Sequence, residues 1–111
     1  MSADPTTTAA LGLEPTYSAR EAAAMLGRSY SWLDQRLRAA QFVLPDGTTV
    51  QPSRTPGGYR RFTLQMLRDI IVASTRQGWF SVEDTRCALR AVIAASYRET
   101  GAYQGAKVRA L

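Results

Sequence analysis

The chain has 111 residues, 45% hydrophobic and 21% charged, which favours one small soluble domain; it has neither an apolar run long enough to span a membrane nor the pattern of a secretion signal, so we expect a cytoplasmic protein. With one cysteine and no histidine, it lacks the commonest general base and metal ligand, and we expect no enzyme, no cofactor and no metal site. The net charge of +5 favours a polyanionic partner.

The first predicted helix follows an N-terminal segment without structure. Residues 1–15 are rich in Thr, Ala and Pro and show no periodicity, so we expect a flexible tail. Ser18 can cap the free amides of a helix start, and Glu21 can reach back to complete a capping box. The strong helix formers of residues 22–26 continue this helix, and Gly27 suits the left-handed position that ends it.

A second helix is predicted over residues 30–40, with Ser29 as its N-cap. Two leucines one turn apart face inward, and Asp34 lies on another face, where we expect it to pair with Arg38. Two short helices joined by a turn that contains glycine are typical of a helix-turn-helix, whose second helix enters the major groove of DNA. The same pair also occurs in small helical domains with no such function.

Two turns are predicted in the irregular part of the chain, residues 41–62. In the first, apolar residues 42–44 and 48–50 flank a Pro-Asp-Gly sequence, which favours a small hairpin. The second turn covers residues 55–58, and we expect type II geometry with Gly57 in the positive-φ position.

Arginines lie on both sides of the second turn. Arg54 precedes it, and Arg60 and Arg61 follow it. Guanidinium groups at a hairpin tip are costly to bury, so they face water or an anion, and phosphate is the obvious candidate.

Two more helices complete the prediction. The first covers residues 63–77, and the second starts after a capping sequence at Ser81 and Asp84 and continues to about residue 100. Both are expected to be scaffold, with Cys87 inert in the core. The expected apolar face of the last helix comprises Val82, Leu89, Val92, Ile93 and Tyr97.

Two motifs resemble the MerR-type winged helix-turn-helix family. Gly58-Tyr59-Arg60-Arg61-Phe62-Thr63 before a helix resembles the end of that family's wing, and Gly78-Trp79-Phe80-Ser81-Val82-Glu83 resembles the joint between the two helices after it. The resemblance spans residues 17–97 and implies a mainly α fold of about four helices with a β-hairpin wing, over residues 16–100, that binds double-stranded DNA. Residues 54–62 are the expected wing, and residues 46–52 resemble an insertion that lengthens it or adds a strand to it.

The resemblance also implies which residues contact DNA. On the second helix these are Ser29, Tyr30, Ser31, Gln35 and Arg38, of which Ser31, Gln35 and Arg38 form the major-groove face. In the wing, Tyr59 packs against the DNA backbone, and the residues expected at phosphates or in the minor groove are Arg54, Arg60 and Arg61.

Three roles stay open on this scaffold. Stand-alone domains of this type are similar to small transcriptional regulators and to excisionase-type accessory proteins of phages or mobile elements. The third role is a protein-interaction module, which would dock its partner through aromatic residues, namely Tyr30, Trp32, Trp79 and Phe80.

The end of the chain bears on regulation and assembly. Family regulators carry a long coiled-coil helix and an effector-binding segment after these helices, whereas residues 101–111 are predicted to be a flexible tail. We therefore expect no small-molecule effector. We also expect a monomer that self-associates cooperatively on adjacent DNA sites, through the wing, helix ends or the corner at Trp79 and Phe80.

Overall fold

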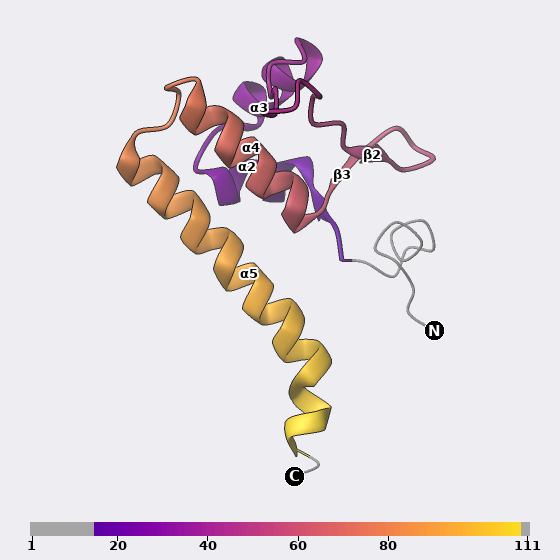
Figure 1. Ribbon diagram of the computed structural model, residues 1–111. Helices are drawn as coiled ribbons and strands as arrows, with labels where there is room; N and C mark the ends of the chain where they lie inside the picture. The colour runs from indigo at the N-terminus through magenta and orange to yellow at the C-terminus, as the bar shows by residue number, and fades with distance from the viewer. Residues whose placement is uncertain (1–14, 110–111) are drawn as a thin grey trace.

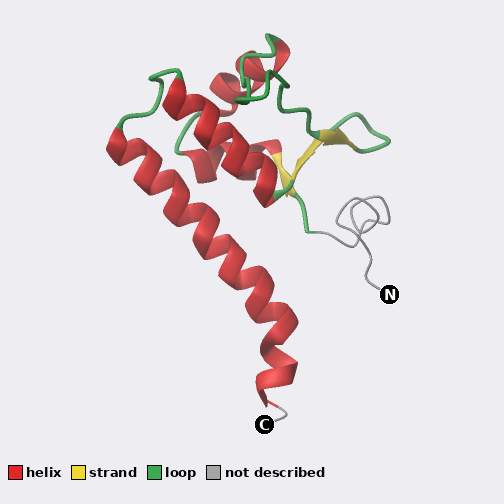
Figure 2. Ribbon diagram, in the orientation of Figure 1, coloured by secondary structure: helices red, strands yellow, loops and turns green. Residues whose placement is uncertain are grey.

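The computed structural model of the chain describes the backbone of residues 15–109 and side chains up to Glu99. Four helices and a small three-stranded antiparallel sheet make up this region (Figures 1 and 2), which confirms the predicted mainly α fold with a β wing. In chain order the elements are β1 (Tyr17–Ser18), α2 (Ala19–Leu26), α3 (Tyr30–Arg38), β2 (Ser53–Arg54), β3 (Arg60–Phe62), α4 (Leu64–Arg76) and α5 (Val82–Arg109). The tail expected at residues 1–15 lies almost wholly outside the described residues.

The helix starts follow the predicted caps. Ser18 Oγ accepts a hydrogen bond from the Glu21 amide at 3.1 Å, and the Ser18 amide donates to Glu21 Oε1 at 2.9 Å, so the capping box of α2 is complete. Ser29 caps α3 and Thr63 caps α4 with one such bond each, because their hydroxyl oxygens accept the amides of Trp32 and Met66. The helix α3 ends two residues earlier than predicted, because Ala40 takes a left-handed conformation with φ +52°.

The wing consists of β2, β3 and the turn between them, and it projects from the helices on the side away from α5 (Figure 1). Its turn is closed by a hydrogen bond from the Gly58 amide to the Thr55 carbonyl at 2.8 Å. Positive φ occurs at Gly58, at +86°, and not at Gly57, so the prediction of a type II turn is wrong. The pattern fits a type I turn followed by a left-handed glycine, a frequent three-residue hairpin loop.

A third strand, β1, was not predicted. It pairs with β3 in the register Tyr17 to Phe62, which gives the strand order β1-β3-β2. The hairpin predicted from residues 42–44 and 48–50 is reduced to one antiparallel bridge between Val43 and Thr49.

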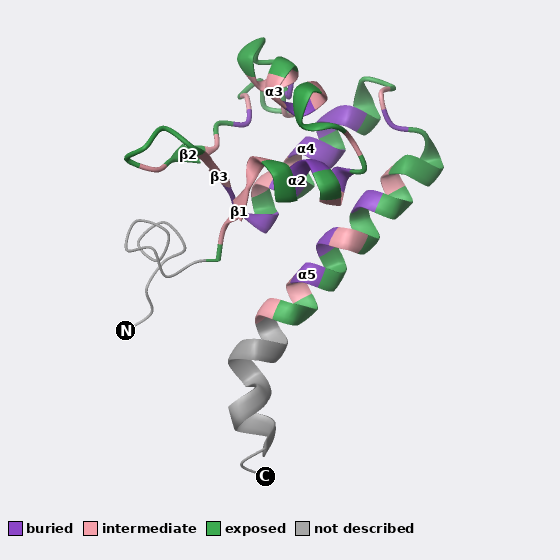
Figure 3. Cartoon of the chain, turned by 180° about the vertical axis from the view of Figure 1, so that it is seen from behind, coloured by how far each residue is buried: buried purple, intermediate pink, exposed green. Residues whose placement is uncertain are grey.

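The core lies where α2, α3 and β3 meet α4 and α5. Figure 3 shows buried residues along the faces of α4 and α5 that point toward the other helices. Phe62, Leu33, Leu67 and Ile70 are fully buried and anchor β3, α3 and α4 to this core. Burial of each side chain of this size contributes about 1.5–3 kcal/mol, so these contacts fix where the wing and α3 stand.

An aromatic cluster closes the core beside α3. Trp32 packs against Phe42, Trp79 and Phe80 with ring centroids 5.8–6.3 Å apart. Arg36 lies over Trp79 at 4.2 Å from the ring centroid. Of the four aromatic residues proposed to dock a protein partner, Phe80 is thus buried in the core, Trp32 and Trp79 are half-buried, and Tyr30 is exposed.

The packing face of α5 differs from the predicted one. Ala88, Val92 and Ala95 are buried, and their spacing of four and three residues places them on one face. Four of the five residues expected there are exposed instead, namely Val82, Leu89, Ile93 and Tyr97. Small alanines let α5 approach its neighbours closely, so they take the inner positions.

Two other predictions for α5 are wrong. Cys87 is exposed rather than in the core, with its Sγ 3.6 Å from Glu83 Oε1. The helix also continues to Arg109, well past the expected end near residue 100, so the backbone of most of the predicted C-terminal tail is helical.

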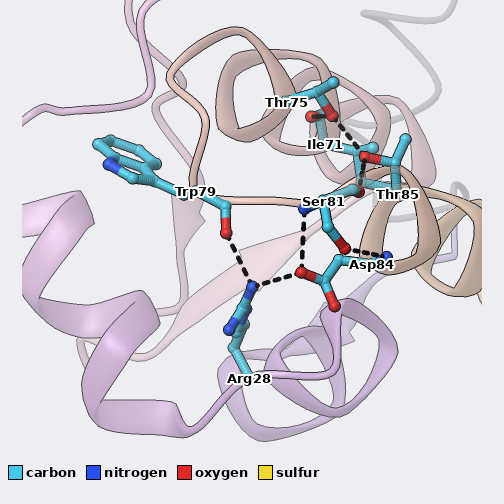
Figure 4. A network of polar contacts seen from close by, with 7 residues as sticks. All are labelled: Arg28, Ile71, Thr75, Trp79, Ser81, Asp84 and Thr85. Carbon is cyan, nitrogen blue, oxygen red and sulfur yellow. Dashed lines mark hydrogen bonds and ion pairs between the residues drawn. The ribbon is translucent and has the colours of Figure 1, made fainter.

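A polar network fixes the joint between α4 and α5 (Figure 4). The Ser81 amide donates to Asp84 Oδ2 and the Asp84 amide donates to Ser81 Oγ, both at 3.0 Å, which confirms the expected cap. Arg28 adds a link from the α2–α3 turn, because its Nη2 donates to the Trp79 carbonyl at 2.9 Å and to Asp84 Oδ2 at 3.2 Å. These bonds hold the pKa of Asp84 below its usual value, chiefly through the Ser81 amide.

Tyr17 links β1 to α5, and its hydroxyl gives a test of this fold. Tyr17 Oη donates to Glu99 Oε2 at 2.9 Å, and burial, followed by this hydrogen bond, raises the pKa of Tyr17 to about 12 from 10.0. Because the pKa of Tyr17 is higher in the folded than in the unfolded protein, its protonation contributes to stability below pH 10, and this contribution is lost as the pH rises toward 12.

We therefore expect a difference between the wild-type protein and Tyr17→Phe in urea denaturation. The free energy of unfolding of the wild-type protein should fall more steeply between pH 10 and pH 12 than that of the variant. Equal loss in the two proteins would contradict the contact.

Candidate nucleic-acid interface

A cleft of about 1200 Å³ lies between the start of α2, the helix α3 and the wing. Five arginines and one aspartate line it, which leaves four net positive charges among the charged residues of its wall. The arginines are Arg20, Arg38, Arg54, Arg60 and Arg61. A concave surface with this charge attracts phosphate groups.

Six of the nine predicted site residues lie together in this cleft, namely Tyr30, Arg38, Arg54, Tyr59, Arg60 and Arg61. The other three, Ser29, Ser31 and Gln35, do not line it. Ser29 Oγ accepts the Trp32 amide as the cap of α3, so its hydroxyl already serves the helix start. Ser31 and Gln35 are exposed on α3, and with Arg38 they form one stripe at intervals of four and three residues.

Asp34 joins α3 to the wing. Its Oδ2 accepts Arg38 Nε at 2.8 Å, as predicted, and its Oδ1 accepts Arg60 Nη1 at 2.6 Å, which was not predicted. The Arg60 side chain is only 11% exposed, whereas that of Arg38 is 73% exposed. The hydrogen bonds from Arg60 and then Arg38 hold the pKa of Asp34 below its usual value. Arg60 is therefore held in an ion pair, which differs from the free phosphate-binding arginine that the sequence predicted.

The other wing residues are placed differently. Arg61 donates from Nε to Thr16 Oγ1 and from Nη2 to the Thr16 carbonyl, both at 3.0 Å, and thus braces the segment before β1. Arg54 is exposed and donates to the Gly58 carbonyl at 2.8 Å, so it stiffens the turn while its remaining donors face water. Tyr59 is 75% exposed at the tip.

Arg20 is a cleft residue that the sequence prediction missed. It lies in the first turn of α2, is exposed, and stands over the ring of Tyr30 at 5.3 Å from the centroid. Its position two residues after the cap Ser18 could have indicated this role, because the free amides and the dipole at the N-terminus of a helix attract anions. The DNA-binding residues predicted from the sequence lie only on the second helix, its cap and the wing.

Among the described residues, no group of three His, Cys, Asp or Glu side chains lies close enough to hold a metal ion. In the same part of the chain, no helix is both long and apolar enough to cross a membrane.

Comparisons with known proteins give a family but no function. Neither the curated proteins nor the solved structures contain a match to this chain. One family model, described as a domain of unknown function (DUF7229), matches residues 7–95, which include α2, α3, the wing, α4 and the start of α5. The chain therefore belongs to the DUF7229 family.

Proposed function

We propose that this domain binds double-stranded DNA in a sequence-specific manner, as a MerR-like winged helix-turn-helix protein that regulates transcription. The observation that carries the proposal is the cationic cleft, because it places exposed arginines of α2, α3 and the wing around one concave surface. The exposed stripe of Ser31, Gln35 and Arg38 beside it supports base contacts in the major groove, where Gln suits adenine and Arg suits guanine.

The proposal also concerns compartment and assembly. It implies a cytoplasmic protein that needs no small-molecule effector. Neighbouring copies on adjacent sites would meet through the wing, the helix ends or the corner at Trp79 and Phe80, where Trp79 is half-buried. The excisionase-type role shares the same DNA-binding step, and the test below addresses that step.

A retardation assay across a salt series tests the proposal. Apart from Arg60, which Asp34 holds, the cleft arginines are Arg20, Arg38, Arg54 and Arg61, and each phosphate contact that they make contributes about 0.9 to the slope of log K against log salt. We expect binding to a 30-base-pair duplex with a slope of about −3 to −4. No retardation at 50 mM salt and micromolar protein would refute the proposal.

A further inference from the structure

We infer that Asp34 is a positioning residue for DNA binding, which joins the wing to α3 and withholds Arg60 from the phosphates. The inference rests on the proposed function and deepens it. It concerns how the two DNA-contacting elements are kept in register with each other.

The ion pairs of Asp34 divide between two elements. Arg38 lies on the same helix as Asp34, four residues later, whereas Arg60 lies on β3, 26 residues away in sequence. Asp34 itself is 19% exposed in its side chain, close to the 11% of Arg60. The Asp34–Arg60 pair is thus largely shielded from water, whereas in the Asp34–Arg38 pair the arginine side chain is exposed to water.

The exposure difference separates the roles of the two arginines. Arg38, which is 73% exposed, can turn toward a phosphate without breaking a shielded contact. Arg60 cannot leave Asp34 without breaking the shielded pair, which would leave Asp34 with the exposed Arg38 as its remaining partner. Ion pairs shielded from water are weakened little by salt, so the link to Arg60 persists under the conditions in which DNA binds.

The carboxylate of Asp34 lines the cleft and would repel the phosphates of the proposed DNA ligand, so its presence there calls for a structural explanation. The strands of the wing pair with each other at only two positions, Ser53 with Arg61 and Arg54 with Arg60, and the buried Phe62 anchors the end of β3 in the core. The link from Asp34 to Arg60 adds a direct connection between the helix and the wing at one of these pairs. The repulsion is then the cost of holding the two elements at a fixed separation.

Two consequences for binding follow. With Asp34 in place, Arg60 makes no phosphate contact. The number of contacts that the salt slope gives is therefore smaller than the number of arginines in the cleft. The fixed separation favours DNA on which α3 and the wing can engage together, so Asp34 contributes to discrimination between sequences more than to affinity.

A double-mutant cycle of Asp34→Asn and Arg60→Gln tests the inference. The probes are a 30-base-pair duplex that the wild-type protein selects from a random library, and an unselected duplex of the same length. We expect Asp34→Asn to free Arg60, to steepen the salt slope by about 0.9 and to tighten binding to the unselected duplex. The preference for the selected duplex should fall about tenfold.

The other variants complete the cycle. Arg60→Gln alone should leave the salt slope unchanged while it weakens binding to the selected duplex. Added to Asp34→Asn, it should return the steepened slope to the wild-type value. Asp34→Glu, which keeps the charge, should keep the wild-type slope.

Glu83→Gln is the matched control, because Glu83 is an exposed carboxylate paired with Arg86 on α5, outside the cleft. It changes the net charge by the same amount and should leave the preference unchanged. Two results would overturn the inference while DNA binding stands. One is an unchanged preference of Asp34→Asn for the selected duplex, and the other is a salt slope that becomes shallower by about 0.9 in Arg60→Gln alone. If the wild-type protein binds no duplex, the proposed function fails first and the inference falls with it.

Discussion

Replacing Arg20 and Arg54 together by alanine should weaken binding to duplex DNA about 60-fold at 0.1 M salt, because each lost phosphate contact removes about 0.9 logarithmic units of electrostatic affinity at that concentration. The two residues lie on α2 and on the wing, and both are exposed on the wall of the cleft. The salt slope should become shallower by about 1.8. Fluorescence anisotropy with a labelled duplex at several salt concentrations measures both quantities.

A control variant separates local contact from overall charge. Arg68→Ala with Arg90→Ala removes the same two positive charges from exposed positions on α4 and α5 that do not line the cleft. We expect its slope to stay within about 0.3 of the wild-type slope, since distant exposed charges are screened. Equal losses in the two double variants would show general attraction to DNA and would contradict the cleft as the interface.

Phe62→Ala should destabilise the fold by about 3–5 kcal/mol, a large part of the stability of a small domain. Phe62 is 0% exposed, ends β3 and pairs with Tyr17 of β1, so its ring fastens the wing to the core just before α4 begins. The alanine would leave a cavity at this junction. Urea denaturation followed by circular dichroism gives the change in the free energy of unfolding.

Tyr59→Ala is the matched control for that loss. Tyr59 is also an aromatic residue of the wing, but it lies at the exposed tip, so we expect its removal to change the free energy of unfolding by less than about 0.5 kcal/mol. A similar destabilisation by both substitutions would mean that the ring of Phe62 does not anchor the wing.

The starts of the helices were predictable because their signals are local. Ser18, Ser29 and Thr63 each hydrogen-bond an amide three residues later, so a hydroxyl at the right place in the sequence is enough to locate the helix. The pairing of Asp34 with Arg38 was predictable for the same reason, since residues four apart on a helix are neighbours.

Contacts between distant segments could not be predicted from the sequence. No periodicity indicates that Arg60 would meet Asp34 across 26 residues, or that β1 would pair with β3. The packing face of α5 was predicted wrongly because the larger apolar residues were assigned to the core, while close helix packing selected Ala88 and Ala95. The cleft arises from these distant contacts, so only some of its residues, and not its shape, followed from the sequence.

The exposed position of Cys87 provides a convenient route to experiments on the unaltered chain. It is the single cysteine of the sequence, it lies on α5, and it does not line the cleft. A thiol-reactive fluorophore or spin label would therefore attach at one known point, with every arginine of the cleft kept. Distances from that point to a second label on a duplex would give the orientation of the domain on DNA.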